Sequence, residues 1–269
     1  MNRITTNEIT EKANIRTLLL DDNGRIIDNF IVLNVNNNDR LLISDSSKIS
    51  DLYKQVTKYI ILENINIDDI SYSYKRISIV GNGSCKLLSK ILKYNILLSE
   101  KVFFDDFSFF IFIDKSKPIE WIDIIIQSKD LSKLEKIIED NIPQVSDLNF
   151  KKFRFKYLIT TLDEVIGINP LELSLIDLIS FSKGCYIGQE VIARMDTYNK
   201  VTRKLVRLIS DFPFEQKKLS THKSKNVGQL LSILCEDSEI NTSLALALVK
   251  NKYIANSIFC GAKPVFISD

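Results

Sequence analysis

Short hydrophobic runs separated by turn-forming residues at the start of the chain predict a β-meander. Residues 16–20 form a first predicted strand, and residues 21–24 end in Asn-Gly, the dipeptide that most favours a tight hairpin turn. Residues 25–35 return as a second strand. After an asparagine-rich turn, residues 41–43 form a third.

Helical spacing of hydrophobic residues begins next. Leu52, Val56, Tyr59 and Ile60 predict a helix over residues 50–62 with Ser50 as its N-cap. The same reasoning predicts helices over 85–94 and 131–140, strands over 70–80 and 121–126, and one long strand or a hairpin over 102–113. Helices mixed with antiparallel strands indicate the α+β fold class.

A glycine-containing turn, residues 81–84, joins a predicted strand to a predicted helix. This arrangement looks like a dinucleotide-binding fingerprint, but Lys86 stands where a third glycine is expected. An acidic residue about 20 residues further on at a strand end is also missing. The pattern therefore favours a plain turn between a strand and a helix.

The pattern of predicted elements changes after Arg203. Short predicted strands with little helix between them cover residues 204–209, 228–234, 244–249 and 265–267. This pattern predicts a small separate β-domain, a barrel. The predicted division is an α+β region, residues 1–202, followed by a barrel domain, residues 203–269. The lysine-rich run 217–225 is interpreted as a solvated loop.

The amino-acid composition mainly excludes classes of binding partner. The 269 residues are 45% hydrophobic and 26% charged, as in ordinary globular proteins, and the formal net charge is only +2. Such a charge gives no strong field for an anionic partner, so no stable nucleic-acid binding is expected. No apolar run approaches the roughly 20 residues of a membrane span, so no membrane association is expected either.

Cysteine and histidine usage narrows the chemistry further. Without a signal peptide or a C-x-x-C pair, the four cysteines are expected to be free thiols in a reducing compartment. Cys85, Cys235 and Cys260 lie in apolar contexts and are interpreted as core or incidental residues. The only histidine is His222. A Ser-His-Asp triad would therefore need that residue, and a Cys/His zinc site would have too few ligands.

Residues 181–194 hold the densest set of chemical groups. Cys185 lies two residues from Lys183 and just ahead of a predicted helix that starts after Gly188. A nearby cation and a helix N-terminus both favour a thiolate, which can act as a nucleophile or a ligand. The alternative is a buried structural cysteine in a glycine turn, because free cysteine is often buried.

Residues 179–190, Ile-Ser-Phe-Ser-Lys-Gly-Cys-Tyr-Ile-Gly-Gln-Glu, closely resemble the signature of the YgfZ family of folate-binding proteins. That family is related to the glycine-cleavage T-protein and to mitochondrial iron–sulfur assembly factors. Further stretches resemble the family in the same order along nearly the whole chain: 6–9, 18–26, 170–173 and 227–230.

The resemblance implies a T-protein-like fold, with α+β subdomains around a central folate cleft and a terminal β-barrel. It implies tetrahydrofolate or a derivative as cofactor, and iron–sulfur assembly or client proteins as partners. It also implies an indirect influence on tRNA modification through iron–sulfur enzymes. The location it implies is the cytoplasm of a bacterium, or the mitochondrial matrix of a eukaryote.

The candidate site residues follow from the same resemblance. Cys185 and Lys183 are the candidate catalytic pair, with Lys183 tuning the thiol. The candidate folate-binding residues are Asn29, Glu172, Gln189 and Arg194. Alternatives without a binding or catalytic role remain open: a surface acid at Glu172, a solvated lysine at Lys183, and a helical ion pair between Arg194 and Glu190.

Three departures from the related proteins are present, and the first two turn the interpretation away from aminomethyl transfer from glycine. The pair Asp28-Asn29 falls where T-proteins carry an Asp-Asp pair that includes their catalytic acid, and Asn29 cannot act as that acid. T-proteins have no cysteine at the position of Cys185. Residues 158–160 are Leu-Ile-Thr where relatives often have Gly-Ile-Pro. The leading hypothesis is a folate-using iron–sulfur assembly or repair factor. The alternatives are a folate-dependent one-carbon transferase and a binding module in which folate only stabilises the fold.

Overall fold

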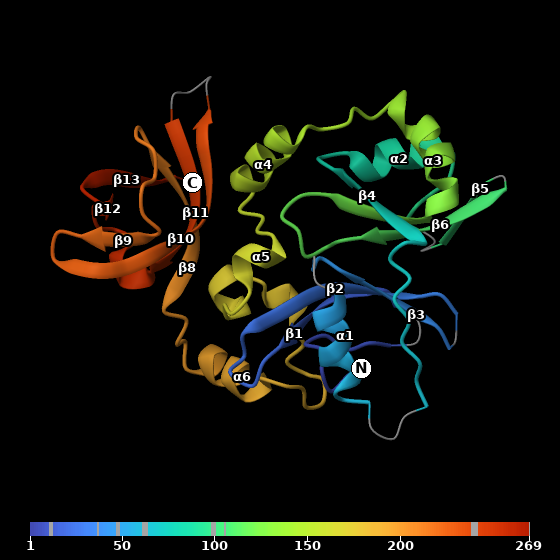
Figure 1. The fold of residues 1–269 in the computed structure, drawn as a ribbon, viewed down its shortest axis with the longest axis horizontal. Helices are drawn as coiled ribbons and strands as arrows, with labels where there is room; N and C mark the ends of the chain where they lie inside the picture. The colour runs from blue at the N-terminus through green and yellow to red at the C-terminus, as the bar shows by residue number, and fades with distance from the viewer. Residues whose placement is uncertain are drawn as a thin grey trace.

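The computed structural model describes residues 1–10, 13–36, 38–46, 49–60, 64–97, 101–104, 106–237 and 242–268, with the backbone alone described at residues 104 and 235–237. Two antiparallel sheets, a closed barrel and the helices between them make up the fold (Figure 1). The predicted α+β class with a C-terminal barrel is confirmed.

The first sheet is the predicted meander. It runs β1 (Ile15–Leu20), β2 (Ile26–Asn34) and β3 (Arg40–Ser44). Helix α1 (Ile49–Thr57) buries Leu52 and Val56 against one face of this sheet. The helix is shorter than the predicted 50–62, and Ser50 lies inside its first turn instead of capping it. Residues 61–63 lie outside the described part.

The second sheet has the order β4-β7-β6-β5 and is antiparallel throughout. Its strands are β4 (Tyr74–Val80), β5 (Lys101–Phe104), β6 (Phe107–Ile113) and β7 (Trp121–Gln127). The stretch 102–113 is thus a hairpin, one of its two predicted forms. Helices α2 (Ser84–Leu92) and α3 (Leu131–Glu139) lie together over one face of the sheet, and the short η1 (Ser128–Asp130) leads into α3 (Figure 1).

The opposite face of the second sheet packs on the first sheet through Ile31, Leu33, Phe110, Phe112 and Ile125. The resulting layers are helices, sheet, sheet and helix. Before α2, the turn uses Gly83 in the left-handed region (φ 83°), and the Glu120 carboxylate accepts the backbone N–H of Cys85 at 2.9 Å. A protein carboxylate therefore occupies the start of this helix, as in a plain turn between a strand and a helix.

Short helices connect these sheets to the barrel. They are α4 (Asp147–Lys156), α5 (Leu162–Val165), η2 (Pro170–Leu173), η3 (Ile176–Leu178) and α6 (Gln189–Thr197). The predicted start of α6 after Gly188 is confirmed. Helix α4 was not predicted, because its aromatic and lysine residues lack a clear helical repeat and it is held by packing of Phe153 and Phe155 instead.

The barrel closes in the order β10-β11-β8-β13-β12-β9. Its elements are β8 (Arg203–Ser210), β9 (Lys218–Thr221), β10 (Ser224–Asp237), β11 (Thr242–Lys250), η4 (Asn251–Tyr253), β12 (Ile258–Cys260) and β13 (Lys263–Ser268). Residues 217–225 were wrongly predicted as a loop. They form β9 and the start of β10, because Leu219 and Val227 point into the barrel while the lysines face water.

Candidate functional site

The segment with the candidate thiol is tied to the N-terminal residues of the chain. The backbone N–H of Ser180 donates to the Thr6 carbonyl at 3.0 Å, and that of Ile187 donates to the Arg3 carbonyl at 3.1 Å. Because the two segments are bonded at both ends of this stretch, they form one structural unit.

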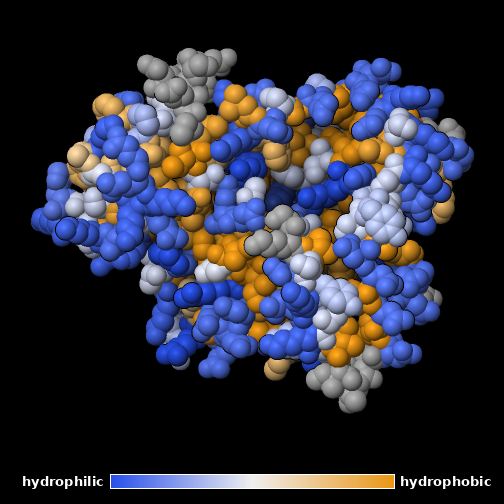
Figure 2. Space-filling model, in the orientation of Figure 1, coloured by the Kyte–Doolittle hydropathy of each residue, from blue (hydrophilic) through white to orange (hydrophobic). Residues whose placement is uncertain are grey.

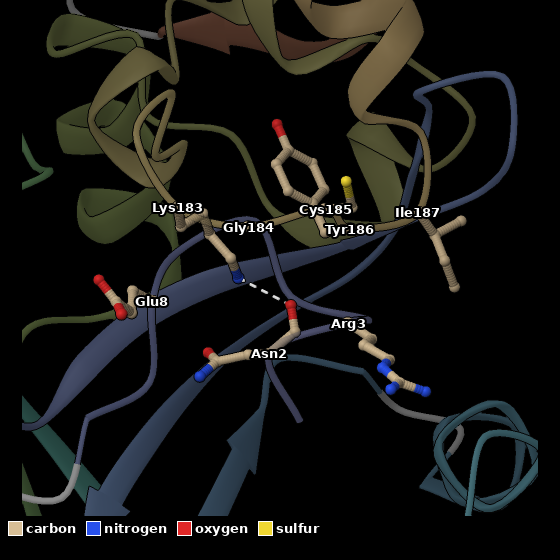
Figure 3. Close-up of a pocket in the computed structure, with 8 residues that line it drawn as sticks. All are labelled: Asn2, Arg3, Glu8, Lys183, Gly184, Cys185, Tyr186 and Ile187. Carbon is tan, nitrogen blue, oxygen red and sulfur yellow. Dashed lines mark hydrogen bonds between the residues drawn. The ribbon is translucent and has the colours of Figure 1, made fainter.

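Lys183 strengthens this connection. Its ammonium donates to the backbone carbonyls of Asn2 (2.9 Å), Thr5 (2.7 Å) and Asn7 (2.9 Å), and the side chain is buried. Burial lowers the pKa of Lys183. Figure 3 shows this side chain directed toward Asn2, whereas the sulfur of Cys185 points to the other side of the segment. Lys183 is thus placed to hold the N-terminal segment.

A surface pocket of about 550 Å³ lies between the two segments (Figure 3). Its lining residues are Asn2, Arg3, Glu8, Lys183, Gly184, Cys185, Tyr186 and Ile187. Cys185 is exposed, whereas Tyr186 is buried in the core beside it. The structure therefore presents an exposed cysteine at the edge of a surface pocket, not a buried structural cysteine.

The two other candidates on α6 occupy different places. The Gln189 side-chain oxygen accepts the backbone N–H of Tyr186 at 3.3 Å, so it braces the turn before the helix. Arg194 is exposed on α6, and the ion pairs among the described residues do not include one with Glu190. Neither residue lines the surface pocket.

Asn29 lies in a second, central pocket of about 50 Å³. Strand β2, the β6–β7 connection and the segment between α4 and η3 meet there, and Figure 2 shows this face of the molecule hollowed near its centre. Most of the lining is apolar: Leu18, Ile26, Pro118, Leu158, Ile159, Leu162, Val165, Leu173, Leu175 and Leu178. The polar lining residues are Asn29, Ser116, Lys117, Thr160 and Thr161.

A buried charge cluster lies behind Asn29. The guanidinium of Arg16, which is 4% exposed, lies 3.0 Å from Asp45, 2.7 Å from Asp114 and 3.2 Å from Asp123. It also donates to the side-chain oxygen of Asn29 at 3.3 Å. Burial opposes ionisation of Asp45, but Arg16 and Arg76 outweigh it and lower the pKa of this carboxyl. The cluster joins the two sheets and fixes the orientation of the Asn29 amide.

Asp28 is the neighbouring carboxylate, and it faces away from the central pocket. Successive strand residues point to opposite faces, so Asp28 lies on the α1 side of β2. Its two oxygens accept from the Ser44 hydroxyl at 2.9 and 3.0 Å, and one accepts the Asn29 N–H at 2.6 Å. Burial raises its pKa to about 6. None of the described lining residues of the central pocket is a carboxylic acid.

The raised pKa of Asp28 makes stability depend on pH. Because the folded state holds this proton more tightly than the unfolded state, the free energy of unfolding should fall as pH rises from about 4 to about 6. Above this window, Asp28→Asn should be more stable than wild type by up to about 3 kcal/mol, since one pKa unit corresponds to about 1.4 kcal/mol. Urea unfolding at several pH values measures this, with the exposed Asp22→Asn as control. Parallel pH profiles for Asp28→Asn and wild type would contradict it.

Glu172 is neither exposed nor in the central pocket. It is 5% exposed, and its two carboxylate oxygens accept from Arg203 at 2.7 and 2.6 Å. The hydrogen bonds to Glu172 raise the pKa of Arg203. This bidentate pair joins η2 to the first barrel strand, which is the strong geometry for an arginine–carboxylate contact.

The predicted site residues are therefore distributed over several places instead of forming one centre. Cys185 and Lys183 line the surface pocket, Asn29 lines the central pocket, and Glu172 contacts the barrel. The sequence did not point to Lys117, which lines the central pocket, or to Arg16, which donates to the side chain of Asn29. Arg16 offered a visible signal, a charge at the start of an apolar strand, whereas Lys117 lies in a loop where no periodic pattern exists.

Comparison with solved structures identifies the fold class of this protein. No family model matches the chain. The solved glycine cleavage system aminomethyltransferase T from Bartonella henselae superposes with a TM-score of 0.75 at 11% identity, covering 99% of this chain and 78% of that chain. At such low identity the likeness shows the fold alone, and that fold is the predicted T-protein fold.

Sequence similarity then points to one family within this class. The tRNA-modifying protein YgfZ of Blochmanniella pennsylvanica (strain BPEN) is 23% identical over 227 residues, 77% of this chain and 67% of that protein. A chloroplastic transferase-like protein of Arabidopsis thaliana is 44% identical over 64 residues, which span 24% of this chain and only 15% of that protein. Weak homology and fold together confirm the resemblance to the YgfZ and T-protein-like family. Each helix in the described part of the chain is too short or too polar to cross a membrane.

Proposed function

We propose that this protein binds a folate and acts in the assembly or repair of iron–sulfur clusters, as a protein of the YgfZ type. The observation that carries the proposal is the central pocket, where Asn29 and Lys117 face apolar walls without a carboxylic acid among the described lining residues. Mostly apolar walls with a few polar groups are typical of small-molecule sites. Such a pocket can bind a folate without acid catalysis.

The ligand of this proposal is tetrahydrofolate or a derivative. We propose that this ligand enters the central pocket beside Leu158. This residue lines the pocket, is 39% exposed, and has a φ of 52°, an unfavourable value for a residue other than glycine. Relatives often have glycine at the corresponding position. A pocket of about 50 Å³ holds little more than water, so the ring enters when the Leu158 segment moves.

The exposed thiol of Cys185 supplies the second part of the function. Cys185 is one of the residues that line a pocket of about 550 Å³, within the usual size range of binding sites. One thiol cannot hold a four-ligand cluster alone, so a cluster would be shared with an assembly or client protein and handled as cargo. An influence on tRNA modification would then be indirect, through iron–sulfur enzymes.

The proposal also assigns roles to the two parts of the chain. Residues 1–202 form the folate-binding region, and residues 203–269 form a separate barrel domain docked through the pair between Glu172 and Arg203. Folate contacts by Gln189, Arg194 and Glu172 are not part of this proposal, because Gln189 and Glu172 already have protein partners and none of the three lines the central pocket.

A folate-dependent one-carbon transferase is the second candidate function, favoured by the T-protein fold. The amide of Asn29 argues against it, because this group cannot transfer a proton as a carboxylic acid does. A turnover assay with methylene-tetrahydrofolate and an amine acceptor separates the two functions. Transfer of the one-carbon unit at a rate above the uncatalysed reaction would favour the transferase.

Two measurements test the leading proposal. Saturating tetrahydrofolate should stabilise the protein, by about 2.7 kcal/mol at 100 times its dissociation constant. Cys185→Ser should keep this shift but lose the ability to restore iron–sulfur enzyme activities in a cell lacking its own YgfZ-type protein. Cys85→Ser, a half-buried thiol elsewhere, is the control and should restore them. An unmoved melting curve would count against folate binding, and full rescue by the serine variant at position 185 would count against the role of the thiol.

A further inference from the structure

Lys117 has an unusual position for a lysine. It lies in the connection between β6 and β7, and it lines the central pocket together with its neighbours Ser116 and Pro118. The side chain is only partly exposed, and its ammonium lies 5.3 Å from the centre of the Trp121 ring. The charge is therefore held at the wall of an apolar pocket instead of extending into bulk water.

The ammonium of Lys117 makes no hydrogen bond or ion pair within the described part of the chain. The nearby carboxylates are already engaged: Asp45 and Asp123 contact Arg16, and Asp114 contacts Arg16 and accepts from Ser116. A lysine ammonium has three donors, so this group can donate to an oxygen of a ligand in the pocket. Burial, followed by the charge of Arg16, lowers the pKa of Lys117.

Asn29 contributes donors to the same pocket. Its side-chain oxygen accepts from Arg16 at 3.3 Å, which assigns the oxygen to the charge cluster and leaves the NH₂ group for another partner. In the described residues that NH₂ group has no protein acceptor within hydrogen-bond distance. The pocket therefore offers donors from two elements, β2 and the β6–β7 connection.

The charges around the pocket also limit the ligand. Arg16, Arg76 and Lys117 balance the three carboxylates Asp45, Asp114 and Asp123, so the cluster is neutral before any ligand binds. A neutral carbonyl and a carboxylate are both compatible with such a pocket, and both present an oxygen acceptor. A ligand edge that presents only N–H donors would leave both protein groups unsatisfied.

We propose that Lys117 and Asn29 form the polar recognition pair of the central pocket and donate hydrogen bonds to a carbonyl or carboxylate oxygen of its ligand. This inference rests on the proposed folate function, and it names the two residues that form hydrogen bonds with the ligand. Lys117 serves binding at the expense of stability, because its charge has no counter-ion in direct contact.

The experiment measures the affinity of variants for two ligands by titration calorimetry. Tetrahydrofolate has a ring carbonyl and carboxylates, whereas 6-methyltetrahydropterin has the same ring carbonyl and no carboxylate. Lys117→Met should bind tetrahydrofolate at least about tenfold more weakly, the usual effect of losing a charged hydrogen bond. The ligand-free variant should melt no lower than wild type. Lys115→Met, an exposed lysine in the same loop, is the matched control and should bind as wild type does.

The two ligands identify the source of the oxygen. Equal weakening for both compounds assigns the ring carbonyl to Lys117, and weakening for tetrahydrofolate alone assigns a carboxylate. Asn29→Asp keeps the acceptor for Arg16 but removes the amide donors, so it should weaken binding as well. Lys117→Arg keeps donors and charge, and should retain most of the affinity.

Unchanged affinity of Lys117→Met, or tighter binding by Asn29→Asp, overturns the recognition pair while leaving folate binding intact. A lower melting temperature of Lys117→Met with unchanged affinity assigns Lys117 to packing and overturns it equally. A wild-type protein that binds neither compound overturns the folate function itself, and with it the ligand read by this pair.

Discussion

Replacing Arg16 with methionine is expected to lower the free energy of unfolding by about 3–5 kcal/mol, the usual cost of removing one partner from a buried ionic group. Arg16 is 4% exposed and contacts three carboxylates from different parts of the two sheets. Asp114 and Asp123 are almost fully buried, with 1% side-chain exposure each. Without the guanidinium, Asp114 and Asp123 lose the cation that contacts them directly.

The effect of Arg16→Met should depend on pH in a defined direction. In the wild type the lowered pKa of Asp45 contributes stability above about pH 4, and this contribution is lost as pH falls. In the variant Asp45 loses this cation and is easier to protonate, so the difference from wild type should be largest at neutral pH and shrink toward pH 4. Urea unfolding at several pH values measures the difference.

Arg76→Met is the matched control for this prediction. Arg76 is 34% exposed and, within the described residues, its one ion pair is with Asp45, so its loss should cost under about 1 kcal/mol, as for most surface ion pairs. Arg16→Lys should recover little, because one ammonium cannot reach three carboxylates as the planar fork does. Equal costs for the two methionine variants would contradict a special role for Arg16.

Much of the fold could be predicted because its pattern is local. The Asn-Gly turn, the short apolar runs of β1 and β2 and the start of α6 after Gly188 each depend on a few adjacent residues. The resemblance of residues 179–190 added the arrangement of these parts, which the pattern alone could not give. Helix α4 and the β9–β10 hairpin were missed, since tertiary packing there overrides a weak local pattern.

The candidate site was harder to predict because its contacts join distant residues. Lys183 bonds to carbonyls more than 170 positions away, so the sequence could suggest a role beside Cys185 but not its actual partners. The pair between Glu172 and Arg203 has the same character, since only the folded barrel brings β8 to η2. Residue types were visible in the sequence, whereas the choice between a binding role and a structural role required the fold.

Gly188→Ala is expected to destabilise the protein by about 2–5 kcal/mol, from backbone strain and overpacking combined. Gly188 has a φ of 80°, a region that residues with a Cβ rarely adopt. A Cβ there would lie 2.6 Å from the backbone oxygen of Asp21 and 2.9 Å from the Cα of Gly24. Both contacts are with backbone atoms of the β1–β2 turn, so neither can be relieved by rotating a side chain.

Gly184→Ala in the same segment provides the control. A Cβ at Gly184 meets no atom within 4 Å, and its backbone is outside the left-handed region. This variant should change stability by less than about 1 kcal/mol, although it lies beside Cys185. Thermal and urea unfolding of both variants measure the difference. Equal destabilisation would mean that the segment tolerates no side chain for reasons other than the close approach of Gly188 to the turn, and the packing argument for this glycine would be wrong.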